Sequence, residues 1–187
     1  MILHRGNYWD YYQVADLFLF TGNSTVKDNG KLVMGAGTAR QVRDQFSGID
    51  QKIGKEIIEG YPPINNKIWK REYLLLVSPG FSKKSPKKIG AFQVKYYWKN
   101  SASLKLIEKS CFALIRFMDA HPGLNIFLPF PGIGNGNKSF EEVFPIVNIL
   151  RNYEKNEKNE TGLSFWVSSN ASFDLGSFTP QVTIVEC

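Results

Sequence analysis

The chain has 187 residues, is 43% hydrophobic and carries a formal net charge of +6. This composition fits one folded domain over residues 1–187, and the positive charge favours anionic partners such as nucleotides or nucleic acid. No apolar run approaches the ~20 residues of a membrane span, and the start of the chain lacks a signal-peptide core. Two cysteines and two histidines, far apart, give neither a disulfide framework nor a zinc site. We therefore expect a cytoplasmic protein that is monomeric, has no cofactor and does not contact membranes.

The first third of the chain predicts a strand, a turn and two helices. Residues 11–20 are rich in aromatic and aliphatic side chains and predict the first strand. Residues 21–31 are polar, and Asp28–Asn29–Gly30 indicates a tight turn. Residues 38–46 have an apolar helical face, and a second helix is expected over 50–59.

The rest of the chain alternates strands and helices. The clearest helix is 101–120, because apolar residues recur there at three- and four-residue steps, and Asn100 or Ser101 can cap it. Strands are expected at 68–77, 89–94, 124–128, 163–167 and 182–185, a lysine-rich loop at 78–88 and a helix at 139–151. This alternation predicts an α/β sandwich with helices on both faces of the sheet.

Two glycine loops each lead into a predicted helix. In the later loop, Gly132, Gly134 and Gly136 alternate after a short apolar run, and Ser139 with Glu142 fits a capping box at the next helix. The earlier loop is Gly35–Ala36–Gly37. A glycine loop at a helix N-terminus presents N–H groups to an anion, usually a phosphate. The alternative is a glycine-rich connection without a ligand, but the pair of loops favours a phosphate-binding crevice.

These features resemble a macrodomain, the ADP-ribose-binding module. Ala15–Asp16–Leu17–Phe18 is similar to the family's early strand end, Met34–Gly35–Ala36–Gly37–Thr38–Ala39 to its first ligand loop, and Gly132–Ile133–Gly134–Asn135–Gly136 to its second. The resemblance implies a three-layer α/β/α sandwich with a mixed central sheet. It also implies that Asp16 contacts the adenine amino group, although a turn or cap residue is the other interpretation of Asp16.

The MGAG form of the first loop resembles one branch of the family. That branch includes terminal ADP-ribose glycohydrolases and the antitoxin partner of a DNA ADP-ribosylating toxin. Its catalytic lysine follows a central strand, where this chain has Lys95. Lys95 can act as a neutral nucleophile, as a charged group near ribose or phosphate oxygens, or as a surface lysine. The branch has an Asp after the second loop, where this chain has Asn137, and Asn29 is the candidate for a first-loop asparagine.

The resemblance implies removal of ADP-ribose from a modified protein or nucleic acid. Two alternatives stay open: a non-catalytic module that binds ADP-ribose or a related nucleotide, and an ADP-ribose 1″-phosphate phosphatase. Lys95 favours the hydrolase, and the absent Asp favours the binding module. The expected catalytic residues are Lys95 and Asn137. The expected ligand-binding residues are Asp16, Leu17, Asn29, Met34, Gly35, Ala36, Gly37, Thr38, Pro131, Gly132, Ile133, Gly134, Asn135 and Gly136.

Overall fold

A seven-stranded sheet forms the centre of the molecule in the computed structural model, which describes residues 2–79, 88–156, 162–168 and 183–186. Most of the predicted lysine-rich loop and Cys187 lie outside these residues. The strand order is β3-β4-β2-β5-β6-β1-β7. The strands are β1 (Ile2–Arg5), β2 (Leu17–Gly22), β3 (Leu75–Pro79), β4 (Lys88–Gln93), β5 (Asn125–Pro129), β6 (Gly162–Val167) and β7 (Thr183–Glu186).

All neighbouring strands run parallel except the pair of β3 and β4, so the sheet is mixed. The carboxyl ends of β2, β4, β5 and β6 therefore meet at one edge. In open α/β sheets, ligands bind beyond this edge. The loops that follow these four strands are consequently the place to look for a site.

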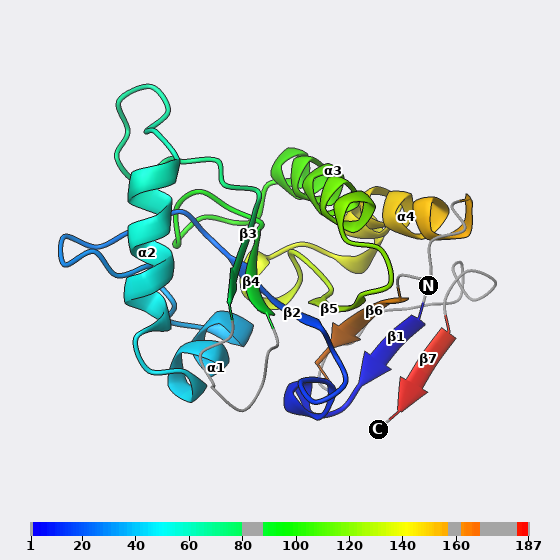
Figure 1. Ribbon diagram of the computed structural model, residues 1–187. Coiled ribbons are helices and arrows are strands. Elements are labelled where there is room, and N and C mark those ends of the chain that lie inside the picture. Colours follow the sequence, from blue (N-terminus) through cyan, green and yellow to red (C-terminus); the bar gives the residue numbers. More distant parts are fainter. Residues whose placement is uncertain (1, 80–87, 157–161, 169–182, 187) are drawn as a thin grey trace.

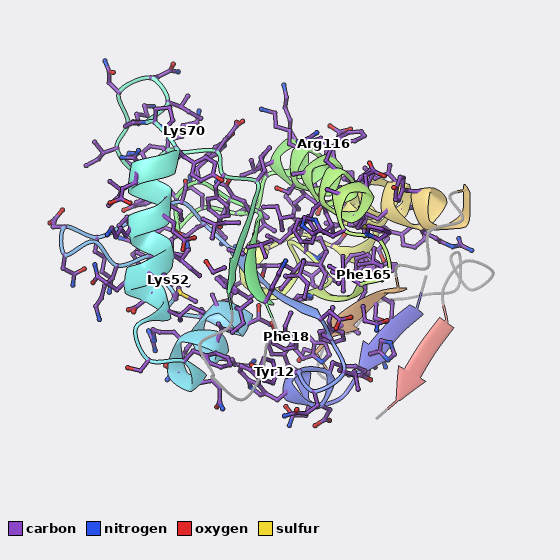
Figure 2. All side chains as sticks on the ribbon, viewed as in Figure 1. Tyr12, Phe18, Lys52, Lys70, Arg116 and Phe165 are labelled. Atoms are coloured by element: carbon purple, nitrogen blue, oxygen red, sulfur yellow. The ribbon has the colours of Figure 1, made fainter. Side chains whose placement is uncertain are left out.

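Helices cover both faces of the sheet, as Figure 1 shows. Helices α1 (Gly37–Gln45) and α2 (Ile49–Gly60) lie on one side, and α3 (Leu104–Ala120) and α4 (Phe140–Asn156) on the other. Strand β2 is buried on both faces: Leu17 and Leu19 join the core under α3 and α4, whereas Phe18, labelled in Figure 2, joins the core under α1 and α2. The predicted three-layer α/β/α sandwich with a mixed sheet is confirmed.

The predicted first strand over residues 11–20 is wrong in its first half. The chain begins with β1, and a short 3-10 helix, η1 (Tyr8–Tyr11), follows before β2 starts at Leu17. The aromatic side chains of Tyr11 and Tyr12 suggested a strand here, but they are half-buried and pack against the core instead. The Tyr8 hydroxyl donates to the Leu19 carbonyl at 2.6 Å, and the Tyr11 ring stacks on Phe127 at 4.4 Å.

Two further boundaries differ from the prediction. The strand expected from residue 68 starts only at Leu75, directly after Leu74, whose positive φ of +58° is incompatible with a strand. Helix α3 is capped by Ser103, whose side chain accepts from the Leu106 N–H, rather than by Asn100 or Ser101. No helix in the described part of the chain has the length and apolarity needed to cross a membrane.

Candidate ligand-binding site

A cavity of about 1560 Å³ opens at the carboxyl edge of the sheet. Both glycine loops line it, through residues 35–38 and 132–137, and the end of β6 contributes Trp166 and Val167. The loops lie side by side, since a Cβ added at Gly37 would stand 3.3 Å from the Asn135 amide nitrogen. The prediction that the two loops share one rim is confirmed. The cavity is larger than the roughly 300–1,000 Å³ typical of small-ligand sites, so a dinucleotide-sized molecule has room.

The first loop opens the N-terminus of α1 toward the cavity. Its N-cap residue, Ala36, has extended backbone and supplies no side-chain cap, so the first-turn N–H groups of α1 keep their capacity to bind an anion. Gly37 has a φ of +58°, which strains any residue with a Cβ. Thr38 fixes the start of the helix to β2, because its hydroxyl accepts from the Thr21 N–H at 3.4 Å.

Gly132 and Gly134 of the second loop both have positive φ, but their surroundings differ. Gly132 has a φ of +84°, and a Cβ there would meet Ile107 at 2.8 Å, so close packing excludes a side chain. Gly134 also has positive φ, +62°, but nothing lies within 4 Å of a Cβ built on it. The space beside Gly134 belongs to the cavity. The backbone approaches the open volume here without a side chain between them.

The predicted capping box at the start of α4 is confirmed. The Ser139 hydroxyl accepts from the Glu142 N–H at 3.2 Å, and the Glu142 carboxylate accepts from the Ser139 N–H at 2.8 Å. The hydrogen bond from the Ser139 N–H is the largest cause that lowers the pKa of Glu142, and a hydrogen bond from the Lys138 amine lowers this pKa further. The Glu142 carboxylate therefore caps the N-terminus of α4. Ser139, which also lines the cavity, was not among the predicted site residues.

Lys95 lies two residues beyond β4 and reaches across the site. Its Nζ donates to the carbonyl oxygens of Asn100 and Asn135, at 2.8 Å each. It thereby links the loop before α3 to the second glycine loop. Burial lowers the pKa of Lys95, which makes its neutral amine more accessible than that of an ordinary lysine. Asn137 lines the same cavity from a left-handed backbone position at the end of η2 (Gly134–Gly136).

Asn23 is a site residue that the sequence prediction missed. It follows β2, is 8% exposed and lines the cavity. Its side-chain N–H donates to the Val33 carbonyl at 2.8 Å, and its amide oxygen accepts from the Thr25 N–H at 2.9 Å. Asn23 therefore holds the end of β2 against the segment that leads into the first glycine loop. The sequence carries no clear signal for this role, since Asn23 is one of several polar residues that follow the apolar run of β2.

Five predicted ligand residues do not line the cavity. Asp16 precedes β2 rather than ending it, so it lies at the opposite edge of the sheet, where its carboxylate accepts from the Asn125 N–H at 2.8 Å. The expected strand-end position of Asp16 is thus corrected. Leu17 and Met34 are core residues, and Asn29 accepts from the Lys31 N–H within its turn. The residues outside the cavity lining are Asp16, Leu17, Asn29, Met34 and Pro131.

The chemistry available in the cavity is that of backbone amides, small polar side chains and lysines. Lys27, Lys95, Lys99 and Lys138 all line it, together with the single carboxylate of Glu141. Among the described residues, no three His, Cys, Asp or Glu side chains gather in a way that would hold a metal ion. This lining suits an anionic, hydrogen-bonding ligand.

Comparison with solved structures identifies the fold. The chain is similar to the macrodomain of Mycobacterium tuberculosis DarG, with 21% identity, a TM-score of 0.65 and coverage of 89% of this chain and 97% of that one. It is also similar to the macrodomain of Thermus aquaticus DarG, with 22% identity, a TM-score of 0.65 and coverage of 90% of this chain and 98% of that one. The structure of Thermosipho africanus DarTG in complex with ADP-ribose has 15% identity and a TM-score of 0.66. The match covers 88% of this chain and 41% of that one. No protein-family model and no curated protein sequence matches the chain.

The chain has a macrodomain-like fold. At these identities the likeness establishes the fold. The resemblance to a macrodomain, first suggested by the loop motifs, is confirmed at this level, and the similar structures include the DarG macrodomains.

Proposed function

We propose that the cavity binds ADP-ribose and that the protein removes ADP-ribose from a modified macromolecule. The observation that carries this proposal is the convergence of two glycine loops, the uncapped N-terminus of α1 and the Lys95 amine on one cavity. Solved structures with this fold include complexes with ADP-ribose. The acceptor is an ADP-ribosylated protein or nucleic acid, and the working unit is a monomer.

The two loops are suited to a diphosphate. N–H groups at the start of α1 and along the second loop can donate to phosphate oxygens, and the helix dipole favours negative charge at that end. Gly134 leaves space for the diphosphate, whereas the Lys138 amine on the same wall is paired with the Glu142 carboxylate at 3.0 Å. Asp16 and Leu17 have no part in this proposed site because of their position at the opposite edge.

Lys95 is the proposed catalytic residue. Its neutral amine would attack the anomeric carbon of the distal ribose, breaking the bond to the acceptor, which leaves with a proton. The glycosylamine formed in this way would open its ribose ring to give an imine. Water would hydrolyse this imine, which releases ADP-ribose and restores the amine. Asn137 would orient a ribose hydroxyl or a water, since an amide cannot serve as a base in the way a carboxylate can.

A binding module without turnover is the second candidate function. The two carbonyl oxygens that accept from Lys95 Nζ stabilise the ammonium, which is not nucleophilic. Turnover therefore requires bound substrate to displace at least one of these bonds. If that does not occur, the same cavity still binds ADP-ribose.

Gly134→Glu tests binding. The carboxylate would enter the space left for the diphosphate and repel it, so calorimetry should detect no ADP-ribose binding to the variant while the wild type binds. Gly123→Glu is the matched control, because Gly123 also has positive φ (+79°) and open space but lies at the turn after α3. Wild-type protein that gives no heat at millimolar ADP-ribose would remove the proposed function.

Lys95→Ala tests turnover. Release of ADP-ribose from ADP-ribosylated oligonucleotide or protein should fall at least ~10²-fold, and borohydride should trap ADP-ribose on Lys95, detectable by mass spectrometry. The wild-type rate should rise with pH and level off below the ordinary lysine pKa of 10.5, because burial lowers the pKa of Lys95. Asn137→Asp should raise the rate. Equal release by Lys95→Ala and wild type would show that the lysine mechanism is wrong, and no release by wild type would favour the binding module.

A further inference from the structure

Gln93, the last residue of β4, is a buried polar side chain that has no part in the proposed reaction. It is fully buried and does not line the cavity, although Lys95 follows it by two residues. The residues of β4 between Lys88 and Gln93 are all apolar or glycine. A buried amide destabilises the fold unless its hydrogen bonds are made. The partners of Gln93 therefore indicate what this side chain holds together.

The side chain of Gln93 uses its full hydrogen-bonding capacity. Its amide oxygen accepts from the N–H groups of Tyr73 and Leu74, at 2.9 and 3.0 Å. Its amide nitrogen donates to the carbonyl oxygens of Arg71 and Lys95, at 2.7 and 3.4 Å. Two donors face one end of the amide and two acceptors face the other, so the side chain fits in one orientation only.

The turn at Leu74 depends on Gln93. Leu74 has a φ of +58°, which is unusual for a residue with a bulky side chain. Gln93 holds this turn twice, because its main-chain N–H donates to the Leu74 carbonyl at 2.8 Å and its side chain accepts from the Leu74 N–H. Strained backbone persists only where its surroundings fix it, and it is concentrated at functional sites. The turn is therefore a reason to ask which functional group Gln93 serves.

Two routes lead from Gln93 to Lys95. The direct route is the hydrogen bond from the Gln93 amide to the Lys95 carbonyl. The second route passes through Glu72, because Gln93 binds the backbone of both residues that flank it. The Glu72 carboxylate accepts from the hydroxyl of Tyr96, the residue after Lys95. Gln93 thus fixes the backbone at Lys95 and immediately after it.

We propose that Gln93 is a positioning residue for Lys95. Its amide fixes the backbone from which the Lys95 amine reaches the carbonyl oxygens of Asn100 and Asn135. The inference rests on the proposed function, which makes this amine the reacting group. Because Gln93 does not line the cavity, it acts on the rate of the reaction and not on the affinity for ADP-ribose. A misplacement of about 1 Å in a reacting group can lower a rate on the order of 10²-fold.

Two substitutions of Gln93 test this role. Gln93→Glu keeps an oxygen for the N–H groups of Tyr73 and Leu74 but leaves at most one donor for two carbonyl oxygens. Gln93→Met removes all four bonds. In both variants, kcat for release of ADP-ribose from an ADP-ribosylated oligonucleotide or protein should fall at least about ten-fold. The Kd for ADP-ribose, measured by calorimetry, should match that of the wild type, which also shows that the variant is folded.

Ser78→Ala is the matched control for lost stability. Ser78 is also fully buried, and its hydroxyl donates to the Glu56 carboxylate at 2.9 Å. It pairs with Ile89, near the start of β4, whereas Gln93 ends this strand. Ser78→Ala should lower the free energy of unfolding and leave kcat unchanged. An equal loss of kcat in Ser78→Ala would show that Gln93 acts through stability alone, which would overturn the inference.

Crystal structures of the two Gln93 variants give a result that does not depend on turnover. In each, the Lys95 Nζ should lie beyond hydrogen-bond distance of the Asn100 or the Asn135 carbonyl oxygen. If Gln93→Met does not fold, Gln93→Glu serves for both measurements. The inference is overturned if the Lys95 amine keeps both bonds, or if kcat stays at the wild-type value. A wild type that releases no ADP-ribose would count against the proposed turnover, and the structures would still decide whether Gln93 positions Lys95.

Discussion

At the scale of single residues, Asn23 supports one wall of the cavity. It is almost fully buried, and its side chain makes two backbone hydrogen bonds that join the end of β2 to the segment before the first glycine loop. Gly22, beside it, has no room for a side chain, since a Cβ there would meet the Tyr73 hydroxyl at 2.6 Å. This wall of the cavity is therefore built by backbone and by one amide.

Asn23→Ala should lower the free energy of unfolding by roughly 1–3 kcal/mol, because the Val33 carbonyl and the Thr25 N–H lose buried partners. ADP-ribose affinity should fall about ten-fold as the first loop loses its support. Urea unfolding and calorimetry would measure the two effects. Asn29→Ala is the control, since exposed Asn29 makes only a local bond to Lys31 and should change stability by less than about 0.5 kcal/mol. Equal effects of the two changes would contradict this role of Asn23.

The contrast between Asp16 and the glycines shows what single residues reveal in a sequence. Gly37, Gly132 and Gly134 could be predicted because their spacing reports a backbone requirement, and all three have positive φ. The role of Asp16 depended on which end of a strand it occupied, and the strand boundary decided that. Asn23 was missed because one asparagine in a polar segment has no pattern of its own.

At the scale of elements, a charged cluster joins the chain before β3 to the turn after β4 and to α3. Glu72 accepts from the Tyr96 hydroxyl and from Lys109 of α3, the latter at 2.9 Å. Burial alone would raise the pKa of Glu72, but these hydrogen bonds outweigh it and the pKa is lowered. Tyr96 follows Lys95 directly, so this cluster supports the turn that carries the proposed catalytic amine.

Glu72→Gln should lower the free energy of unfolding at pH 7 by roughly 1 kcal/mol. Since the folded-state pKa of Glu72 lies below its ordinary value of 4.5, the contribution is fully present above about pH 4.5. It is lost as the pH falls through the folded-state pKa. Thermal unfolding of both proteins from pH 7 to pH 3 should show their difference shrinking. Glu59→Gln, whose exposed carboxylate lies 3.8 Å from Lys55 on α2, should have little effect at any pH, and a constant difference for Glu72→Gln would refute the linkage.

Elements in which apolar residues recur at a regular helical spacing could be predicted from the sequence. Elements defined by tertiary packing could not. Helices α1, α2 and α3 start within three residues of the predicted positions, because their apolar faces repeat at helical spacing. Strand β1 was missed since four residues carry little periodicity. The aromatic run at Tyr8–Tyr12 favours a strand by propensity, but its rings pack as a cluster around Phe18.

At the scale of the whole molecule, ligand binding should be visible as stability. ADP-ribose at 100 times its Kd should add about 2.7 kcal/mol to the free energy of unfolding. For a chain of 187 residues this corresponds to a rise in Tm of roughly 5–10 °C. Differential scanning fluorimetry with increasing ADP-ribose would measure it. Gly134→Glu should unfold at a Tm that does not respond to ADP-ribose, and a response equal to that of the wild type would place the ligand elsewhere.

The pairing of β1 has a consequence for how the molecule assembles. Leu3 aligns with Phe165 on β6 and with Ile184 on β7, so this strand has neighbours only from the far end of the sequence. Strands β2 to β5 pair among themselves over shorter separations. Closing the longer loop costs more chain entropy before any contact compensates for it. We expect strands β2 to β6, which carry both glycine loops, to form first, because β6 pairs with β5 over a short separation, and β1 to pair with β6 and β7 in a later, slower step of folding.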